Sequence, residues 1–456
     1  MKAEWGPDGG LDILGKVLSQ VKGEADARYY QGRRTYLRFA NSRLYQPLHE
    51  ETVSISLRVA VDRGRLGVAT TTDISEGGLA ELVDRATSMA KKAPKLERFP
   101  GFPQDPRERT AKAPASKSII DGELEGKAKE LSEALGLVQS ELKDARTSGV
   151  YSQGLTLLAV ANTSSLSRST IRTIAHSSFL TEKMDVDPTT SGWAEQTHWD
   201  PAKVNLVTLA KEAVARTPRE KASSLKPGTY RVLLGSPAVA DLIDMLSYCM
   251  GAVAVEEGWS FLEGMKGKQL ASKAVTIDDD PLDPIGLPEA IDFEGMPTRK
   301  RTVFDKGIPA GPAHDTLTAA RLGGKTTCSA LPPEAPYGSV GPIPRHLTFD
   351  RGDANIDEMV KELRRGVIVT RLHYVRFVHR KKTIITGMTR DGTYWVEKGE
   401  IKGPVTNLRL TDGILRVLAG TEIVGKDLRC HGRGVTASVV PSLLVHGLTF
   451  PTATTF

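Results

Sequence analysis

Apolar and polar side chains alternate along Thr52-Val53-Ser54-Ile55-Ser56-Leu57-Arg58-Val59-Ala60-Val61. Residues 35–41, Thr-Tyr-Leu-Arg-Phe-Ala-Asn, show the same alternation. Successive side chains of a strand point to opposite faces, so both segments predict strands that pack one face against a core. A turn at Asp62-Arg63-Gly64 and a returning strand over residues 66–71 extend this predicted sheet.

Helical spacing of apolar residues flanks these strands. It appears at residues 11–21 and 79–90, and a charged helix is expected over about residues 122–144. Further strands are expected at residues 155–161 and 167–175. The first half therefore predicts a sheet with packed helices.

The second half changes character after a polar segment at residues 216–228, which contains Pro218 and Pro227. A strand at residues 230–234 follows, and Gly235-Ser236-Pro237 then reads as a helix entry. An amphipathic helix is expected at about residues 239–250, with Ile243 and Leu246 packed into the core. Short strands with Gly and Pro turns then continue, interrupted by a helix near residues 356–363. We expect an α+β protein with an N-terminal domain at residues 1–225 and a mostly antiparallel C-terminal domain at residues 226–456.

Composition excludes several classes of protein. The net charge of +6 is spread over 456 residues, without the clustered basic face typical of a nucleic-acid-binding protein. Three distant cysteines cannot build a disulfide framework or a CxxC zinc site. No apolar stretch approaches the roughly 20 residues that span a bilayer. We expect a cytoplasmic protein that binds neither nucleic acid nor membranes.

Several local patterns imitate known sites and fail on spacing. Gly323-Gly324-Lys325-Thr326 resembles the end of a phosphate-binding loop, but Ala319 stands where the motif requires glycine. Ser339 lies in Tyr337-Gly338-Ser339-Val340-Gly341, where a nucleophile elbow would need glycine in place of Tyr337. Asp278-Asp279-Asp280 can hold a cation or form a turn after a strand at residues 273–277, and the turn is favoured.

The histidines and cysteines give no convincing site. His373 and His379 lie six residues apart in an expected strand, about 20 Å along an extended chain, too far to share a metal. Cys430 and His431 are adjacent, so an extended backbone would point them to opposite faces. The sequence contains no H-E-x-x-H helix.

Several segments follow one another in an order that is fairly specific to one family of proteins. They begin with Arg38-Phe39-Ala40-Asn41-Ser42 and continue with Gly258-Trp259-Ser260-Phe261 and Ile291-Asp292-Phe293-Glu294-Gly295-Met296-Pro297. The most recognisable one is Tyr394-Trp395-Val396-Glu397-Lys398-Gly399-Glu400-Ile401-Lys402-Gly403-Pro404-Val405. Together these segments resemble the TldD/PmbA family, and the resemblance extends over nearly the whole chain.

The resemblance implies that a zinc motif is degenerate in this chain. TldD-type members carry H-E-x-x-x-H on the helix before the Gly258 segment, where two imidazoles bind zinc and the glutamate acts as general base. Counting back without gaps places Ile243 and Tyr248 at the two histidine positions and Asp244 at the glutamate. Cys430 lies where TldD-type chains supply a third ligand. We therefore expect no metal and no catalytic residue in this chain.

By resemblance the chain is of the PmbA type, a metal-free subunit of a heteromeric zinc metallopeptidase. Such a subunit pairs with a TldD-like partner that bears H-E-x-x-x-H and holds the zinc, and together they cleave unfolded or leader peptides. The peptide-binding residues, the peptide, the choice between homodimer and heterodimer, and any role of Cys430 or His431 are left open. The alternatives are a stand-alone enzyme or ligand-binding protein in secondary metabolism, or a regulatory scaffold.

Overall fold

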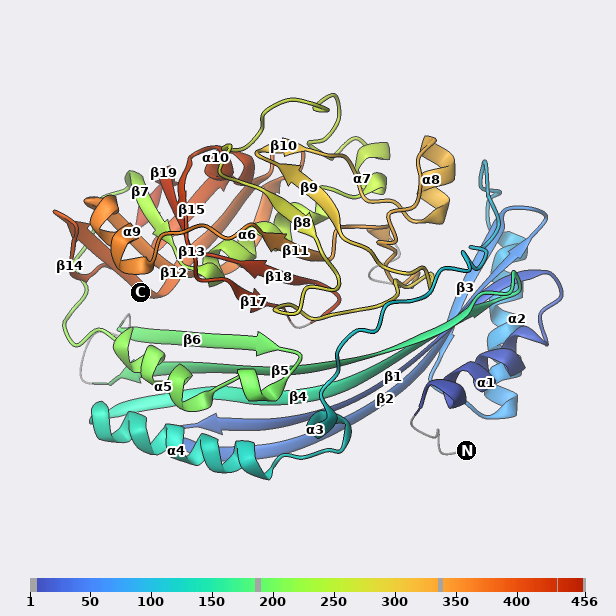
Figure 1. Cartoon of the computed structure of the whole chain (residues 1–456), viewed down its shortest axis with the longest axis horizontal. Helices are drawn as coiled ribbons and strands as arrows, with labels where there is room; N and C mark the ends of the chain where they lie inside the picture. Colours follow the sequence, from blue (N-terminus) through green and yellow to red (C-terminus); the bar gives the residue numbers. More distant parts are fainter. Residues whose placement is uncertain (1–5, 185–189, 335–338, 433, 454–456) are drawn as a thin grey trace.

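The alternating segment forms part of a long, curved antiparallel sheet (Figure 1). The computed structural model describes residues 6–184, 190–334, 339–432 and 434–453. The strand order in this first sheet is β3-β2-β1-β4-β5-β6. The strands are β1 (Glu24–Ala40), β2 (Arg43–Val61), β3 (Arg65–Thr71), β4 (Ala145–Asn162), β5 (Ser167–Lys183) and β6 (Ser191–His198). Ile55, Leu57 and Val59 are fully buried, which confirms the predicted inward face.

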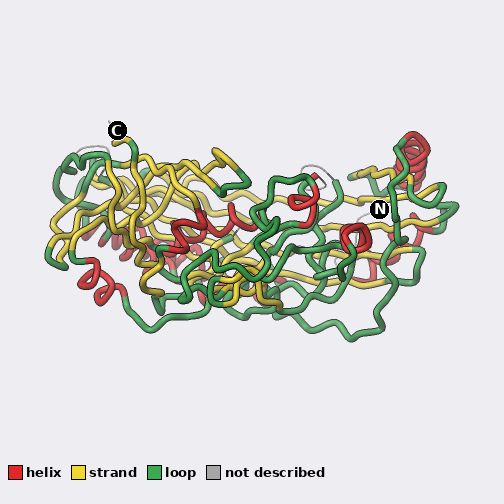
Figure 2. The backbone as a smooth tube through the Cα atoms, turned by 90° about the horizontal axis from the view of Figure 1, so that it is seen from above, coloured by secondary structure: helices red, strands yellow, loops and turns green. Residues whose placement is uncertain are grey.

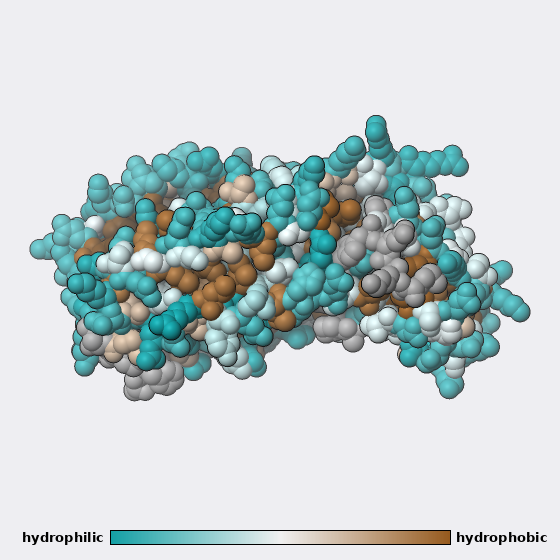
Figure 3. Space-filling model, turned by 90° about the horizontal axis from the view of Figure 1, so that it is seen from below, coloured by the Kyte–Doolittle hydropathy of each residue, from teal (hydrophilic) through white to brown (hydrophobic). Residues whose placement is uncertain are grey.

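Helices cover one face of this sheet, at two places (Figure 1). At the N-terminal end of β1 and the C-terminal end of β2, Leu14 and Leu82 pack with Ile55 and Leu57. The second group of helices packs its apolar face over β4 and β5, around Phe179. These helices are α1 (Pro7–Leu18), α2 (Glu76–Lys92), α3 (Lys117–Ile120), α4 (Glu125–Glu141), α5 (Leu206–Ala215) and the 3-10 turn η1 (Pro201–Lys203). Seen from below, hydrophilic and hydrophobic residues are interspersed on this side of the molecule (Figure 3).

The C-terminal half contains two further sheets, ordered β10-β9-β8-β11-β18-β17 and β16-β19-β7-β12-β13-β15-β20, with β14 paired to β13. Parallel pairing occurs between β11 and β18 and between β7 and β12, and the other strand pairs are antiparallel, as predicted. The strands are β7 (Gly228–Leu234), β8 (Ile277–Asp279), β9 (Arg301–Asp305), β10 (Ile308–Pro309), β11 (His346–Phe349), β12 (Arg365–His379), β13 (Ile384–Glu397), β14 (Glu400–Pro404), β15 (Leu408–Gly413), β16 (Thr421–Val424), β17 (Arg429–His431), β18 (Ala437–Val440), β19 (Leu443–Phe450) and β20 (Thr452–Ala453). The helices are α6 (Ser236–Tyr248), α7 (Ala252–Glu256), α8 (Thr316–Leu322), α9 (Ile356–Leu363) and α10 (Ile414–Ala419).

The α+β class is thus confirmed. The molecule is elongated (Figure 2), and the C-terminal half lies along the first sheet (Figure 1). The strands of the first sheet all precede residue 200, and β7 begins at Gly228, close to the predicted boundary. The division into two domains at residues 225 and 226 stays a prediction. Among the helices that the structure describes, none combines the length and the apolar character needed to cross a membrane.

The acidic run at residues 278–280 corrects one prediction. Asp278 and Asp279 lie in β8, so the strand begins where the sequence predicted its end. Asp279 Oδ1 accepts hydrogen bonds from the backbone N–H groups of Arg345 (3.1 Å) and His346 (2.9 Å). Lys300 Nζ lies 2.8 Å from Asp278 Oδ2. These contacts offset the free-energy cost of burying the Asp278 and Asp279 carboxylates in a strand, although their local sequence is typical of a turn.

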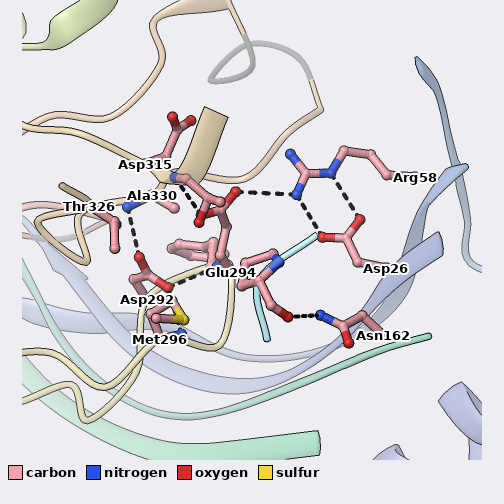
Figure 4. A network of polar contacts seen from close by, with 12 residues as sticks. Asp26, Arg58, Asn162, Asp292, Glu294, Met296, Asp315, Thr326 and Ala330 are labelled. Atoms are coloured by element: carbon pink, nitrogen blue, oxygen red, sulfur yellow. Dashed lines mark hydrogen bonds and ion pairs between the residues drawn. The ribbon is translucent and has the colours of Figure 1, made fainter. Parts of the chain in front are cut away.

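A buried ionic network joins the first sheet to the C-terminal half (Figure 4). Asp26 on β1 faces Arg58 directly across the strand pair, and Arg58 donates to both of its carboxylate oxygens, at 2.9 and 2.6 Å. Arg28 Nη2 donates to Asp26 at 2.7 Å, and its Nε donates to the Phe293 carbonyl. Arg58 also reaches Glu294 at 3.4 Å. The Phe293 and Glu294 contacts come from the C-terminal half, so the network fixes the two halves together.

The loop that carries Glu294 is held by backbone donors (Figure 4). Asp292 Oδ1 accepts from the N–H groups of Glu294 and Met296, both at 2.9 Å, and Oδ2 accepts from Ala330 at 3.1 Å. Glu294 Oε2 accepts from the Thr316 N–H at 2.9 Å. These hydrogen bonds hold the loop at residues 292–296 against the backbone at Thr316 and Ala330.

Arg58→Ala should lower the free energy of unfolding by about 3–5 kcal/mol, because it removes both Arg58 hydrogen bonds to buried Asp26, which keeps only Arg28, and the Arg58 contact to buried Glu294. The side chains of Asp26 and Glu294 are only 1% and 4% exposed. Urea unfolding measures the loss. The control is Lys129→Ala, which breaks an exposed helix pair with Glu125 and should cost less than about 1 kcal/mol. Equal losses in the two variants would contradict the role assigned to the network.

Candidate functional site

The helix that carries the degenerate zinc positions starts at a tight strand-to-helix connection. Strand β7 ends at Leu234, Gly235 caps the helix, and Ser236 opens α6. A side chain at Gly235 would meet the Thr370 carbonyl oxygen at 2.8 Å, so the connection requires glycine. This close approach sets the start of α6 against β12.

Ile243 faces the interior of the C-terminal half. Its side chain is 0% exposed, and Leu246 on the same helix is 1% exposed. Both belong to one apolar core that also contains Val239 and residues of β7, β12 and β19. The expectation that these α6 residues pack in the core is confirmed, and a hydrocarbon side chain offers no donor to a metal.

Two carboxylates on α6 occupy the opposite, polar side. Asp244 Oδ1 accepts a hydrogen bond from Thr436 Oγ1 at 2.9 Å. Burial raises the pKa of Asp244, and the hydrogen bond from Thr436 opposes that rise. Burial also raises the pKa of Asp241 to about 7, and the neighbouring carboxylates of Glu195 and Asp244 add to the shift while Arg371 opposes it. This side of α6 therefore holds acids that gain protons easily.

Tyr248 lies at the other end of the helix, in an aromatic cavity of about 480 Å³. Met245, Trp259 and Phe377 share its wall, and the Arg380 guanidinium lies 5.0 Å from the centre of the Trp259 ring. The three motif positions thus point to different surroundings: a core, a threonine and an aromatic cavity.

His431 makes the most specific polar contact at α6. Its Nδ1 lies 2.9 Å from Glu195 Oε1, and its Nε2 lies 3.2 Å from Ser236 Oγ. Serine, histidine and acid in this order match the contacts of an activated nucleophile. However, Ser236 and His431 are 4% and 8% exposed, so a substrate has no access to the hydroxyl. The contact instead fastens β17 and β6 to the start of α6.

Cys430 points away from its neighbour, as strand geometry predicted. It packs with Ile174, Leu287 and Val439, on the side opposite the His431 contact. Burial raises the pKa of its thiol to about 12, so the neutral thiol predominates, and thiolate is the metal-binding form.

No group of three or more His, Cys, Asp or Glu side chains within the described ranges is arranged to hold a metal ion. The residues present at α6 do not suit a zinc ion, because Ile243 cannot ligate it and both nitrogens of His431 are engaged. The sequence missed the Glu195–His431–Ser236 contact. Its members lie 195 and 236 positions apart, and only the Gly-Ser-Pro helix entry hinted at Ser236.

Ile243→Ala should destabilise the protein by about 2–4 kcal/mol, because it leaves a cavity in a closely packed core. Thermal or urea unfolding measures the loss. Ile356→Ala on α9 is the matched control, because its side chain is 40% exposed, and it should change stability by less than about 0.5 kcal/mol. A loss at Ile243 no larger than at Ile356 would contradict this placement.

Asp241→Asn should stabilise the protein more at pH 8 than at pH 5. A folded-state pKa near 7 lies above the ordinary 3.8, so the folded chain binds the proton more tightly, and wild-type stability falls as pH rises through this window. The amide removes that loss. Melting temperatures at both pH values test this, with Asp84→Asn, an exposed aspartate of α2, as control. A pH-independent difference would refute it.

Comparisons with known proteins bear on both halves. The family model described as "PmbA/TldA metallopeptidase C-terminal domain" matches residues 227–452, and "PmbA/TldA metallopeptidase domain 1" matches residues 25–90. A protein of Methanothermobacter thermautotrophicus named "Metalloprotease" is 28% identical over 196 residues, 41% of this chain and 40% of that protein. "Metalloprotease PmbA" of Escherichia coli O157:H7 is 25% identical over 242 residues, 52% of this chain and 50% of that protein.

The matched segments thus span half or less of these curated relatives. Among solved structures, TldE from Thermococcus kodakarensis superposes with a TM-score of 0.83 at 17% identity, covering 97% of this chain and 99% of that one. This likeness shows the fold. With family models that match 226 and 66 residues of both halves in order, the chain belongs to the TldD/PmbA family.

Proposed function

We propose that the chain is a metal-free, PmbA-like subunit of a heteromeric TldD/PmbA-type zinc metallopeptidase that acts on unfolded or leader peptides. The contacts of α6 carry this proposal. Ile243 at the expected first ligand position is packed in the core, and Asp244 at the expected base position is bound to Thr436. The names of the curated relatives, which are metalloproteases, support the reaction class.

The chemistry of a zinc peptidase explains the proposed division of labour. Such an enzyme needs ligands that hold the metal and a base that takes the proton of the bound water. In the proposed pair a TldD-like subunit with H-E-x-x-x-H supplies both, and its zinc is the cofactor of the complex. This chain contributes protein surface that completes the compartment for the peptide.

Cleavage by the separate and mixed subunits tests the proposal. The chain alone should cleave no unfolded casein or leader peptide and should contain no stoichiometric zinc by elemental analysis. Adding it to the TldD-like partner should raise the partner's cleavage rate. Asp244→Asn should leave the rate of the mixture nearly unchanged, whereas replacing the partner's motif glutamate by glutamine should abolish it.

Other outcomes identify the alternatives. Chelator-insensitive cleavage by this chain alone would refute the subunit role. A mixture no more active than the partner alone would also contradict the proposal.

A further inference from the structure

The aromatic cavity at the C-terminal end of α6 has walls that a ligand can reach. Met245 and Tyr248 lie three residues apart on α6, so they share one face of the helix. Trp259 and Phe377 add walls from two other segments of the chain. All four residues are half-buried, so part of each side chain stays accessible. The volume of about 480 Å³ is within the range of known ligand pockets.

Cys249, which directly follows Tyr248, holds these walls together. Its backbone carbonyl accepts a hydrogen bond from Ser260 Oγ at 2.5 Å, which fixes the segment that carries Trp259. Its thiol donates to the Arg380 carbonyl at 3.6 Å, which places the residue after β12 at the same point. Segments far apart in the sequence therefore converge on the end of α6 through their contacts with one residue.

Arg380 lines the same cavity and is exposed to solvent. Its guanidinium lies over the Trp259 ring, 5.0 Å from the ring centre. A stacked guanidinium uses its planar face and keeps the N–H groups at its edge free for acceptors. Within the described ranges no carboxylate lies at ion-pair distance from these N–H groups, whereas the next residue, Lys381, is paired with Glu263 at 2.5 Å. Arg380 is therefore an unpaired cation at the cavity.

Glu257 is the acid that lines this cavity, and it is bonded to the cavity wall. Its carboxylate accepts a hydrogen bond from the Trp259 indole N–H at 2.7 Å, which fixes the orientation of the ring. A cationic ligand is disfavoured, because the Trp259 ring already carries the Arg380 guanidinium. An uncharged aromatic group suits the walls, and a carboxylate beside it suits Arg380.

We propose that this cavity binds an aromatic side chain of an extended peptide that carries a carboxylate two residues away, paired with Arg380. In an extended chain such side chains point to the same side. An aromatic ring packs favourably against other aromatic rings and against the thioether of Met245. The inference deepens the proposed function and rests on it only for the choice of a peptide as the ligand.

Fluorescence anisotropy with a labelled heptapeptide tests the site on the full chain alone. The probe has a central phenylalanine with a glutamate two residues to either side, and both of its ends are blocked. We expect the matched peptide with alanine in place of phenylalanine to bind at least about tenfold more weakly, because it buries no ring. The peptide with glutamine in place of both glutamates should bind about threefold more weakly, because it loses an exposed ion pair.

Two variants with matched controls assign the residues. Trp259→Ala should reduce binding of the phenylalanine peptide to the level of the alanine peptide, whereas Tyr45→Ala, 77% exposed on β2, should not change it. Arg380→Gln should remove the preference for glutamate over glutamine. Lys381→Gln removes the same charge from the neighbouring position, where Glu263 is the partner, and should keep that preference.

Three results would overturn the proposal. They are equal binding of the phenylalanine and alanine peptides, undiminished binding by Trp259→Ala, and equal effects of Arg380→Gln and Lys381→Gln. The peptide comparison uses the unaltered chain, so it decides the matter even where a variant fails to fold. Neither the partner nor cleavage enters the measurement. Equal binding would therefore contradict the cavity assignment alone, and the peptidase assay would still decide the subunit role.

Discussion

The structure depends on one buried carboxylate, that of Asp26, and on the two arginines that compensate it. Burial by itself raises the pKa of Asp26, but the guanidinium groups of Arg28 and Arg58 outweigh that effect and keep the acid charged. Because each arginine also contacts the C-terminal half, through Phe293 and Glu294, the charge pair on the sheet determines where that half sits. An apolar interface could hold the two halves together without fixing their relative position in this way.

The first sheet was largely predictable because its information is local. The alternation at Ile55, Leu57 and Val59 specifies an inward face whatever lies elsewhere in the chain. The full length of β1, 17 residues, was not predictable, since Arg33 and Arg34 break the alternation where the strand leaves the core. The partners of Asp26 and Arg58 were equally hidden, because Glu294 lies 236 positions from Arg58.

The same contrast holds around α6. Helical spacing placed Ile243 and Leu246 on an apolar stripe, and strand geometry separated Cys430 from His431. What the sequence could not supply was the polar side of the helix. The pKa of Asp241 is raised to about 7 by burial and by Glu195, which lies on β6 of the first sheet. Asp244, three residues along α6, adds to this shift, but burial and Glu195 contribute more, and the spacing within α6 does not encode them.

Two polar regions, one around α6 and one at the interface between the two halves, differ in whether their polar groups all have hydrogen-bond partners. Around α6 the described polar groups bond mainly to one another: Asp244 to Thr436, and His431 to Glu195 and Ser236. At the interface between the two halves, Arg28 retains an N–H without a hydrogen bond, and Arg172 and Arg345 both contact Glu289. A ligand that binds only the folded state stabilises it. Because Arg28 also bonds to Asp26 and to the Phe293 carbonyl, a hydrogen bond to its remaining N–H would stabilise the interface that joins the two halves.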